Sequence, residues 1–339
     1  METADPPFER ILWFFKLFMD QEISNLEPIH VIASRFRGVP RETFLYHLMH
    51  YLETEPALRD KAQNAYNVCL DILFRKRARK LLQRGIGDTL PNCFVIGQPR
   101  SGTTSLHAFF RSHPEIFVPI AKEVNYYSHF SKPVLGPHGM DLDYYLMYFM
   151  DATTERIRCD ISPYYISEPG VALRIFRDTP NAKILAVLRE PIARLTSMYN
   201  LAFPWTTQKD MDNWFLSGME GLRANAPRWN HTGPVSVLFH CFFASQLSEY
   251  KRLFGNFKVF IFEDMMASQE KCYNEICDFL GVARFYDGPY WELRAPAKLR
   301  PSAAVTHTLQ ALLLPEVKRM EAVLGRDLSR WYGEWTPVS

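Results

Sequence analysis

A short glycine-containing loop, set between an apolar run and a helix-forming stretch, constrains this chain more than any other feature. The apolar run Cys93–Ile96 is bounded by proline and asparagine before it and by glycine after it, as expected of a buried strand. The loop Gly97–Thr104 follows. Apolar residues then recur at helical spacing, so we expect a helix to begin near Thr104 and to end at His113, before a proline.

A strand, a tight loop and a helix start together make an anion site. The first backbone N–H groups of a helix lack partners inside the helix and point at whatever lies above the loop. Glycine lets the backbone approach a ligand closely, and four hydroxyl side chains add donors: Ser101, Thr103, Thr104 and Ser105. The loop therefore predicts a phosphate-binding site.

The spacing of the loop is that of a nucleoside-triphosphate loop, but two required residues are absent. Thr103 stands where that motif has lysine. Arg189 stands at the end of the next apolar strand, where an acidic residue is expected to help hold magnesium. This pattern favours a metal-free site in which side chains neutralise the ligand. The alternative, a magnesium-dependent kinase or nucleotidase, needs both missing residues.

Strand and helix patterns alternate after this loop. Such alternation predicts an α/β fold of three layers, in which a P-loop-like parallel sheet is flanked by helices. Residues 1–90 are predicted to form an extra N-terminal helical segment, with helices over 41–51 and 61–82, and residues 91–339 a second domain. The later elements are expected as strands at 156–159, 183–188 and 258–262, and as helices at 170–177, 237–254 and 307–328.

Composition narrows the class of protein. Lysine and arginine total 39 against 37 acidic residues, a balance that argues against general nucleic-acid binding. The six cysteines form no C-x-x-C pair, so we expect free buried thiols, no structural metal and a reducing compartment. The apolar patch Ile11–Phe15 is too short to span a bilayer and follows acidic residues. A cytoplasmic protein without membrane contact is predicted.

Two elements of the sequence resemble a known family. Pro99–Thr104 resembles the 5′-phosphosulfate loop of sulfotransferases that use 3′-phosphoadenosine 5′-phosphosulfate (PAPS). Leu188–Pro191, followed by Arg194 and Ser197, is similar to the 3′-phosphate element of that family. The likeness extends from about residue 92 to residue 331. Segments 122–127 and 161–164 are similar to the heparan or carbohydrate branch, and segments 262–264 and 324–328 are similar to the family as a whole.

The resemblance implies roles for individual residues. Arg100 is expected to neutralise charge on the leaving phosphate, and Arg189 with Ser197 to hold the 3′-phosphate. Lys298 and Arg300 resemble a loop that closes over PAPS. The predicted binding set is Arg100, Ser101, Gly102, Thr103, Thr104, Ser105, Arg189, Ser197, Lys298 and Arg300.

The catalytic base and the adenine contact are predicted with alternatives. Glu123 matches the base of the heparan branch, although Asn125 stands where that branch has histidine, and His129 is the alternative base. Adenine stacking is assigned to Phe262 or to an aromatic residue near Tyr286. Asp160 is a candidate for orienting the base or the acceptor.

The resemblance implies transfer of a sulfuryl group from PAPS to a hydroxyl, an N-hydroxyl or an amine, with adenosine 3′,5′-bisphosphate (PAP) as product. The expected acceptor is a small soluble molecule such as a secondary metabolite or a sugar. Residues 126–145 and 203–229, which are rich in aromatic side chains, are expected to line its cleft. A non-catalytic nucleotide-binding protein is the remaining alternative, and the sequence predicts no oligomeric state.

Overall fold

The computed structural model describes residues 90–119, 122–128, 142–149, 152–203, 205–224, 233–290 and 299–333. The chain forms two compact units. The described part of the first unit comprises residues 90, 119, 122–126, 142–149 and 152–153, and the second unit holds the rest. The helices predicted at 41–51 and 61–82 lie outside the described residues, and the domain boundary after residue 90 stays a prediction.

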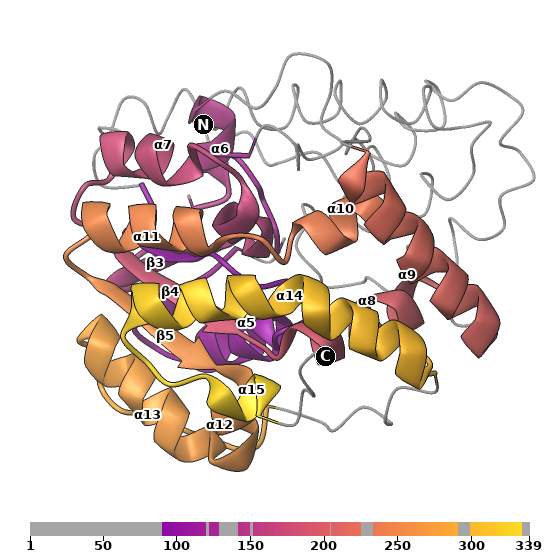
Figure 1. Cartoon of the computed structure of the whole chain (residues 1–339). Coiled ribbons are helices and arrows are strands. Elements are labelled where there is room, and N and C mark those ends of the chain that lie inside the picture. Colours follow the sequence, from indigo (N-terminus) through magenta and orange to yellow (C-terminus); the bar gives the residue numbers. More distant parts are fainter. Residues whose placement is uncertain are drawn as a thin grey trace, which may run out of the picture. The chain divides into compact units, whose positions relative to one another are not determined.

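The second unit is built on a five-stranded sheet in which every pair of neighbouring strands is parallel (Figure 1). The strand order is β2-β3-β1-β4-β5. This architecture confirms the predicted α/β fold with a parallel sheet flanked by helices. The strands are β1 (Cys93–Val95), β2 (Ile116–Phe117), β3 (Ile157–Ile161), β4 (Lys183–Leu188) and β5 (Phe257–Ile261).

Strand β1 occupies the centre of the sheet because its residues are apolar on both faces. All three of its residues are fully buried, and Val95 pairs with Ile161 on one side and Leu185 on the other. Parallel strands buried on both faces have such continuous apolar sequences. The register brings the carboxyl ends of β1 and β4 together, which places the two predicted phosphate-binding elements at one edge.

Helices form layers on this sheet. Helices α5 (Thr103–Ser112) and α13 (Gln269–Leu280) share one apolar core with alternate residues of the strands. A second group, α7 (Val171–Asp178), α11 (Ala244–Leu253) and α14 (Ala303–Leu324), packs together, α11 touching both others (Figure 1). The remaining elements of this unit are η4 (Pro163–Ser167), α8 (Pro191–Ala202), α9 (Gln208–Arg223), α10 (Pro234–Phe239), α12 (Phe262–Ala267) and α15 (Ser329–Tyr332).

One predicted helix is wrong in its extent. The stretch 237–254 forms two helices, α10 and α11, separated by residues 240–243. The reason is a tertiary contact, because Ala244 donates its backbone N–H to Oε1 of Glu316 at 2.7 Å and thereby starts a new helix. Glu316 is itself 4 % exposed. The predicted acceptor stretch 203–229 is largely helix α9, which turns Met211 and Phe215 into the core.

The smaller first unit contributes helix α6 (Leu142–Met147), and within this unit Tyr126 stacks on Tyr145 with ring centroids 4.2 Å apart. Over the whole described part of the chain, no helix is long and apolar enough to cross a membrane. The five cysteines that the structure describes are free and buried, as predicted. Cys69 lies outside the described residues.

Candidate active site

The loop after β1 has the geometry that the sequence predicts. Gly102 adopts a positive φ of 82° directly before α5, a conformation that glycine takes without strain. Gly97 is required for a different reason from ligand approach: an added Cβ would lie 2.4 Å from Cγ2 of Ile166. The end of β1 and the start of the loop therefore pack closely against the neighbouring turn η4.

The loop contains one buried hydroxyl that no described residue contacts through a hydrogen bond. Ser101 is fully buried, and its Oγ has no hydrogen-bond partner in the structure as described. Thr103 is also buried, whereas Thr104 is exposed and Ser105 is half-buried. A buried hydroxyl without a partner costs free energy, so such a group in a loop of this kind indicates a missing ligand.

Arg100 connects the two elements that the sequence identifies separately. Its Nε donates to Oγ of Ser197 at 3.1 Å, and its backbone oxygen accepts from Nη1 of Arg189 at 2.8 Å. Arg100 also has a positive φ of 69°, a conformation that costs energy for a residue with a side chain. The structure thus brings Arg100, Arg189 and Ser197 together across about ninety residues of sequence.

Arg189 is held on several sides. Its guanidinium lies over the ring of Phe262, 4.5 Å from the centroid, and its backbone N–H points to Oε1 of Gln98 at 3.4 Å. Its Nε is buried without a partner among the described residues. Burial lowers the pKa of Arg189, and the charges of Glu263 and Glu190 act in the opposite direction. The unused N–H is available to an anion.

Helix α8 carries Ser197 and is anchored at its first turn. Glu190 caps it by accepting the backbone N–H groups of Ile192 and Ala193. Arg194 is only 1 % exposed, and its Nη2 donates to the backbone oxygen of Val237 and to Sγ of Cys241, both at 3.0 Å. This buried cation, which the sequence identifies only as part of a motif, links α8 to α10 through Val237 and to Cys241, which follows α10.

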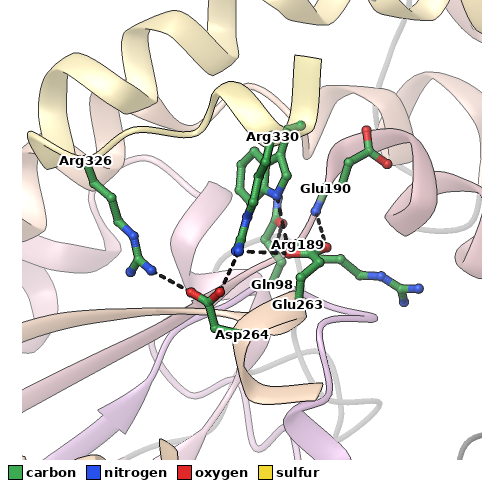
Figure 2. Close-up of polar contacts among 8 residues, drawn as sticks. Gln98, Arg189, Glu190, Glu263, Asp264, Arg326 and Arg330 are labelled. Atoms are coloured by element: carbon green, nitrogen blue, oxygen red, sulfur yellow. Dashed lines mark hydrogen bonds and ion pairs between the residues drawn. The ribbon is translucent and has the colours of Figure 1, made fainter. Parts of the chain in front are cut away.

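The segment after β5 contacts both the strand end at Arg189 and the C-terminal helix (Figure 2). Glu263 accepts the backbone N–H of Glu190 at 3.0 Å. Its neighbour Asp264 forms ion pairs with Arg326 at 2.6 Å and with Arg330 at 2.5 Å. The sequence analysis includes Glu263 and Asp264 only in a resembling segment and assigns them no role, because nothing local reveals these partners.

The predicted base lies in the first unit, and it is described within that unit only. Glu123 is 37 % exposed in its side chain and pairs with Nζ of Lys122 at 2.7 Å. Both Glu123 and Asn125 have positive φ values, 65° and 54°. Non-glycine residues in this conformation concentrate at functional sites. The role of Glu123 as base stays a prediction, and the alternative, His129, lies outside the described residues.

Asp160 sits at the centre of a buried hydrogen-bond relay in the second unit. It is fully buried at the end of β3, and it accepts from Oγ of Ser162 at 2.7 Å and from the Tyr165 hydroxyl at 3.1 Å. The same hydroxyl accepts the backbone N–H of Tyr127 at 3.1 Å. Burial, and next the charge of Asp160, raise the pKa of Tyr165 well above its ordinary value. Asp160 therefore acts on the chain near Tyr127 through Tyr165.

The remaining predicted residues are not all placed in the site. Arg300 is exposed, and Lys298 lies outside the described residues. Of the two adenine candidates, Phe262 lies against Arg189, while Tyr286 stacks on Tyr273 with centroids 5.8 Å apart. Within the described ranges no group of three or more His, Cys, Asp and Glu side chains could hold a metal ion. The predicted absence of a metal stays a prediction.

The arrangement suits a ligand with two anionic groups. Two buried donors, Ser101 Oγ and Arg189 Nε, have no partner among the residues that the structure describes, and they lie on the two elements that Arg100 joins. One anion can lie over the loop and the start of α5, and a second can lie at the carboxyl end of β4. The residues present therefore fit PAPS, whose 5′-phosphosulfate and 3′-phosphate are such groups.

A family model described as "Sulfotransferase domain" matches residues 90–287, more than half of the chain. The membrane-associated sulfotransferase kil1 of Dictyostelium discoideum is 29 % identical over 161 residues, which are 47 % of this chain and 30 % of that protein. Heparan sulfate glucosamine 3-O-sulfotransferase 5 of Homo sapiens is 26 % identical over 110 residues, 32 % of this chain and 30 % of that protein. The matches thus span less than a third of either relative.

A solved structure shows the same fold. The crystal structure of a sulfotransferase from Alicyclobacillus acidocaldarius aligns with a TM-score of 0.58 and 27 % sequence identity. The alignment covers 71 % of this chain and 98 % of that one.

Proposed function

Because the chain belongs to the sulfotransferase family, we propose that it transfers a sulfuryl group from PAPS to a hydroxyl, an N-hydroxyl or an amine of a small soluble acceptor. The observation that carries this proposal is the contact of Arg100 with both Ser197 and Arg189. This contact links the phosphate loop, which lacks the lysine of a triphosphate-binding enzyme, to a second cationic site at Arg189. A ligand with a 5′-phosphosulfate and a 3′-phosphate requires two such sites.

The proposed reaction is an in-line displacement at sulfur. Bound PAPS supplies the activated sulfuryl group, with PAP as the leaving group. A bond forms between the acceptor atom and sulfur, while the bond between sulfur and the bridging oxygen breaks. Positioning and charge stabilisation dominate such transfers, since the protein makes no covalent bond.

Each residue of the proposed site has a separate role in this reaction. Arg100 stabilises the negative charge that grows on the leaving 5′-phosphate; arginine stays protonated, so its role is electrostatic. Ser101, Thr103 and the amides at the start of α5 hold the 5′-phosphosulfate. Arg189 and Ser197 hold the 3′-phosphate. Glu123 takes the proton from the acceptor, which makes the acceptor a better nucleophile.

The acceptor is proposed to be a secondary metabolite or a sugar. The sugar class gains support from the heparan sulfate relative, whose name states action on glucosamine. The cytoplasmic location predicted from the sequence is kept as part of this proposal. A screen of phenols, sterols, amines, monosaccharides and heparan fragments with ³⁵S-labelled PAPS would identify the class, because only a true acceptor takes up label beyond the rate of PAPS hydrolysis.

Calorimetric titration tests the proposal itself. The chain is expected to bind PAP at micromolar concentration without magnesium, and to bind ATP with magnesium much more weakly. Tight magnesium-dependent binding of ATP would support the kinase alternative instead. Failure to bind PAP at micromolar concentration would contradict the proposed function.

A further inference from the structure

Glu263 lies between the strand end that carries Arg189 and the C-terminal helix α15 (Figure 2). Its Oε1 accepts the backbone N–H of Glu190 at 3.0 Å, and its Oε2 accepts the indole N–H of Trp331 at 3.3 Å. Trp331 is 4 % exposed, so the donor of this second contact is buried, while the carboxylate of Glu263 is partly exposed. Neither phosphate-binding motif includes Glu263 or Trp331.

The first of these contacts fixes the backbone at Arg189. The N–H of Glu190 belongs to the peptide group that follows Arg189, and the N–H of Arg189 itself points to Gln98. Side chains from other elements thus contact the peptide groups on both sides of Arg189. The guanidinium of Arg189 lies over the ring of Phe262, the residue before Glu263. Together these contacts determine the direction in which the side chain of Arg189 leaves the backbone.

A carboxylate beside an anion site opposes binding unless its charge is compensated. Here the C-terminal helix supplies the compensation. Arg330 lies 3.9 Å from Oε2 of Glu263, and it also pairs with Asp264, as Arg326 does. The same short segment therefore provides the hydrogen-bond donor that orients Glu263 and a cation, Arg330, that offsets its charge, while Arg326 pairs with the neighbouring Asp264.

We propose that Glu263 is a positioning residue for Arg189, and that the C-terminal segment Arg326–Trp331 contributes through it to recognition of the 3′-phosphate. This inference rests on the proposed function and extends it. The two motifs supply the groups that touch the phosphate, whereas Glu263 and the C-terminal helix set the geometry of one of them.

Calorimetry with two nucleotides tests the inference on the full chain. PAP carries the 3′-phosphate, and adenosine 5′-monophosphate (AMP) lacks it. Glu263→Ala is expected to raise the Kd of PAP about tenfold and that of AMP less than about twofold, since about one hydrogen bond to the backbone is lost. Glu263→Gln keeps an acceptor oxygen and is expected to lose less. Trp331→Phe keeps an aromatic side chain but removes the N–H donor together with the five-membered ring of the indole, with a loss of about threefold for PAP.

The matched control is Arg284→Ala, which removes an exposed ion pair with Asp278 in the same unit and is expected to change neither Kd. If Glu263→Ala does not fold, the Kd values of PAP and AMP for Glu263→Gln and Trp331→Phe, compared with those of wild type, test the inference instead. Equal losses for PAP and AMP, or unchanged PAP binding in the variants, would overturn this inference and leave the proposed function standing. Wild-type protein that does not bind PAP would overturn both.

Discussion

The side chain of Arg189 contacts the ring of Phe262 and the backbone oxygen of Arg100, and side chains contact its two flanking peptide groups. Its buried Nε–H nevertheless has no partner within the described part of the chain. Arg189→Ala is expected to weaken PAP binding by about tenfold to a hundredfold, because a hydrogen bond to a charged group contributes about 1.5–3 kcal/mol. Calorimetry with AMP is the control, since this nucleotide has no 3′-phosphate. Equal loss for both nucleotides would contradict the role of Arg189.

Glu123 is predicted to act on the acceptor and not on the nucleotide. Glu123→Gln keeps the size of the side chain and removes its ability to take a proton. Turnover, measured with an acceptor from the screen, is expected to fall by about a hundredfold or more, with the Kd of PAP unchanged. Full turnover in this variant would show that the base lies elsewhere, and His129 would be the next residue to replace.

The turn between β1 and α5 depends on contact with η4. Gly97→Ala places a Cβ 2.4 Å from Cγ2 of Ile166, and such overpacking is expected to cost about 1–3 kcal/mol of unfolding free energy. Urea denaturation of Gly97→Ala, Ile166→Ala and the double variant measures the coupling. Ile166→Ala removes Cγ2 but keeps its Cβ, which lies 2.7 Å from the added carbon. The double variant should therefore lose less than the sum of the two single losses without recovering full stability. Strict additivity would show that the loop relaxes without Ile166.

The cap of α8 makes stability depend on pH. Burial raises the pKa of Glu190 above its ordinary value of 4.5, against the effect of the capped N–H groups. A raised folded-state pKa gives stability that is fully present below about pH 4.5 and is lost as pH rises through the folded value. The melting temperature of wild type minus that of Glu190→Gln is therefore expected to fall as pH rises from 4 upward. A constant difference would contradict the raised pKa.

For the second unit as a whole, nucleotide binding and folding are linked. PAP at a hundred times its Kd should raise the unfolding free energy by about 2.7 kcal/mol, because only the folded chain has the site. AMP at the same concentration should give a smaller shift of melting temperature, in line with its weaker binding. Scanning fluorimetry with each nucleotide in turn measures these shifts of melting temperature. Identical shifts would mean that the 3′-phosphate makes no contact.

The sequence predicts the sheet and the meeting of the two motifs because both depend on local signals. Apolar runs mark β1 and β4, and parallel strands bring their carboxyl ends to one edge. The contacts of Gln98 and Glu263 could not be predicted, since each joins residues 73 to 91 positions apart and leaves no local pattern. The break between α10 and α11 has the same origin in Glu316, 72 residues away from Ala244.

The parallel order of the sheet has a consequence for how the protein can be assayed. Arg100, Arg189 and Glu263 follow three strands that are adjacent in space and distant in sequence, so none of the local segments can bind nucleotide on its own. Pairing of strands so distant in sequence is slow, because long loops must close before the pairing contacts form. Partly folded molecules are therefore expected not to bind PAP, so titration with PAP should measure the fraction of a preparation in which the central sheet is complete.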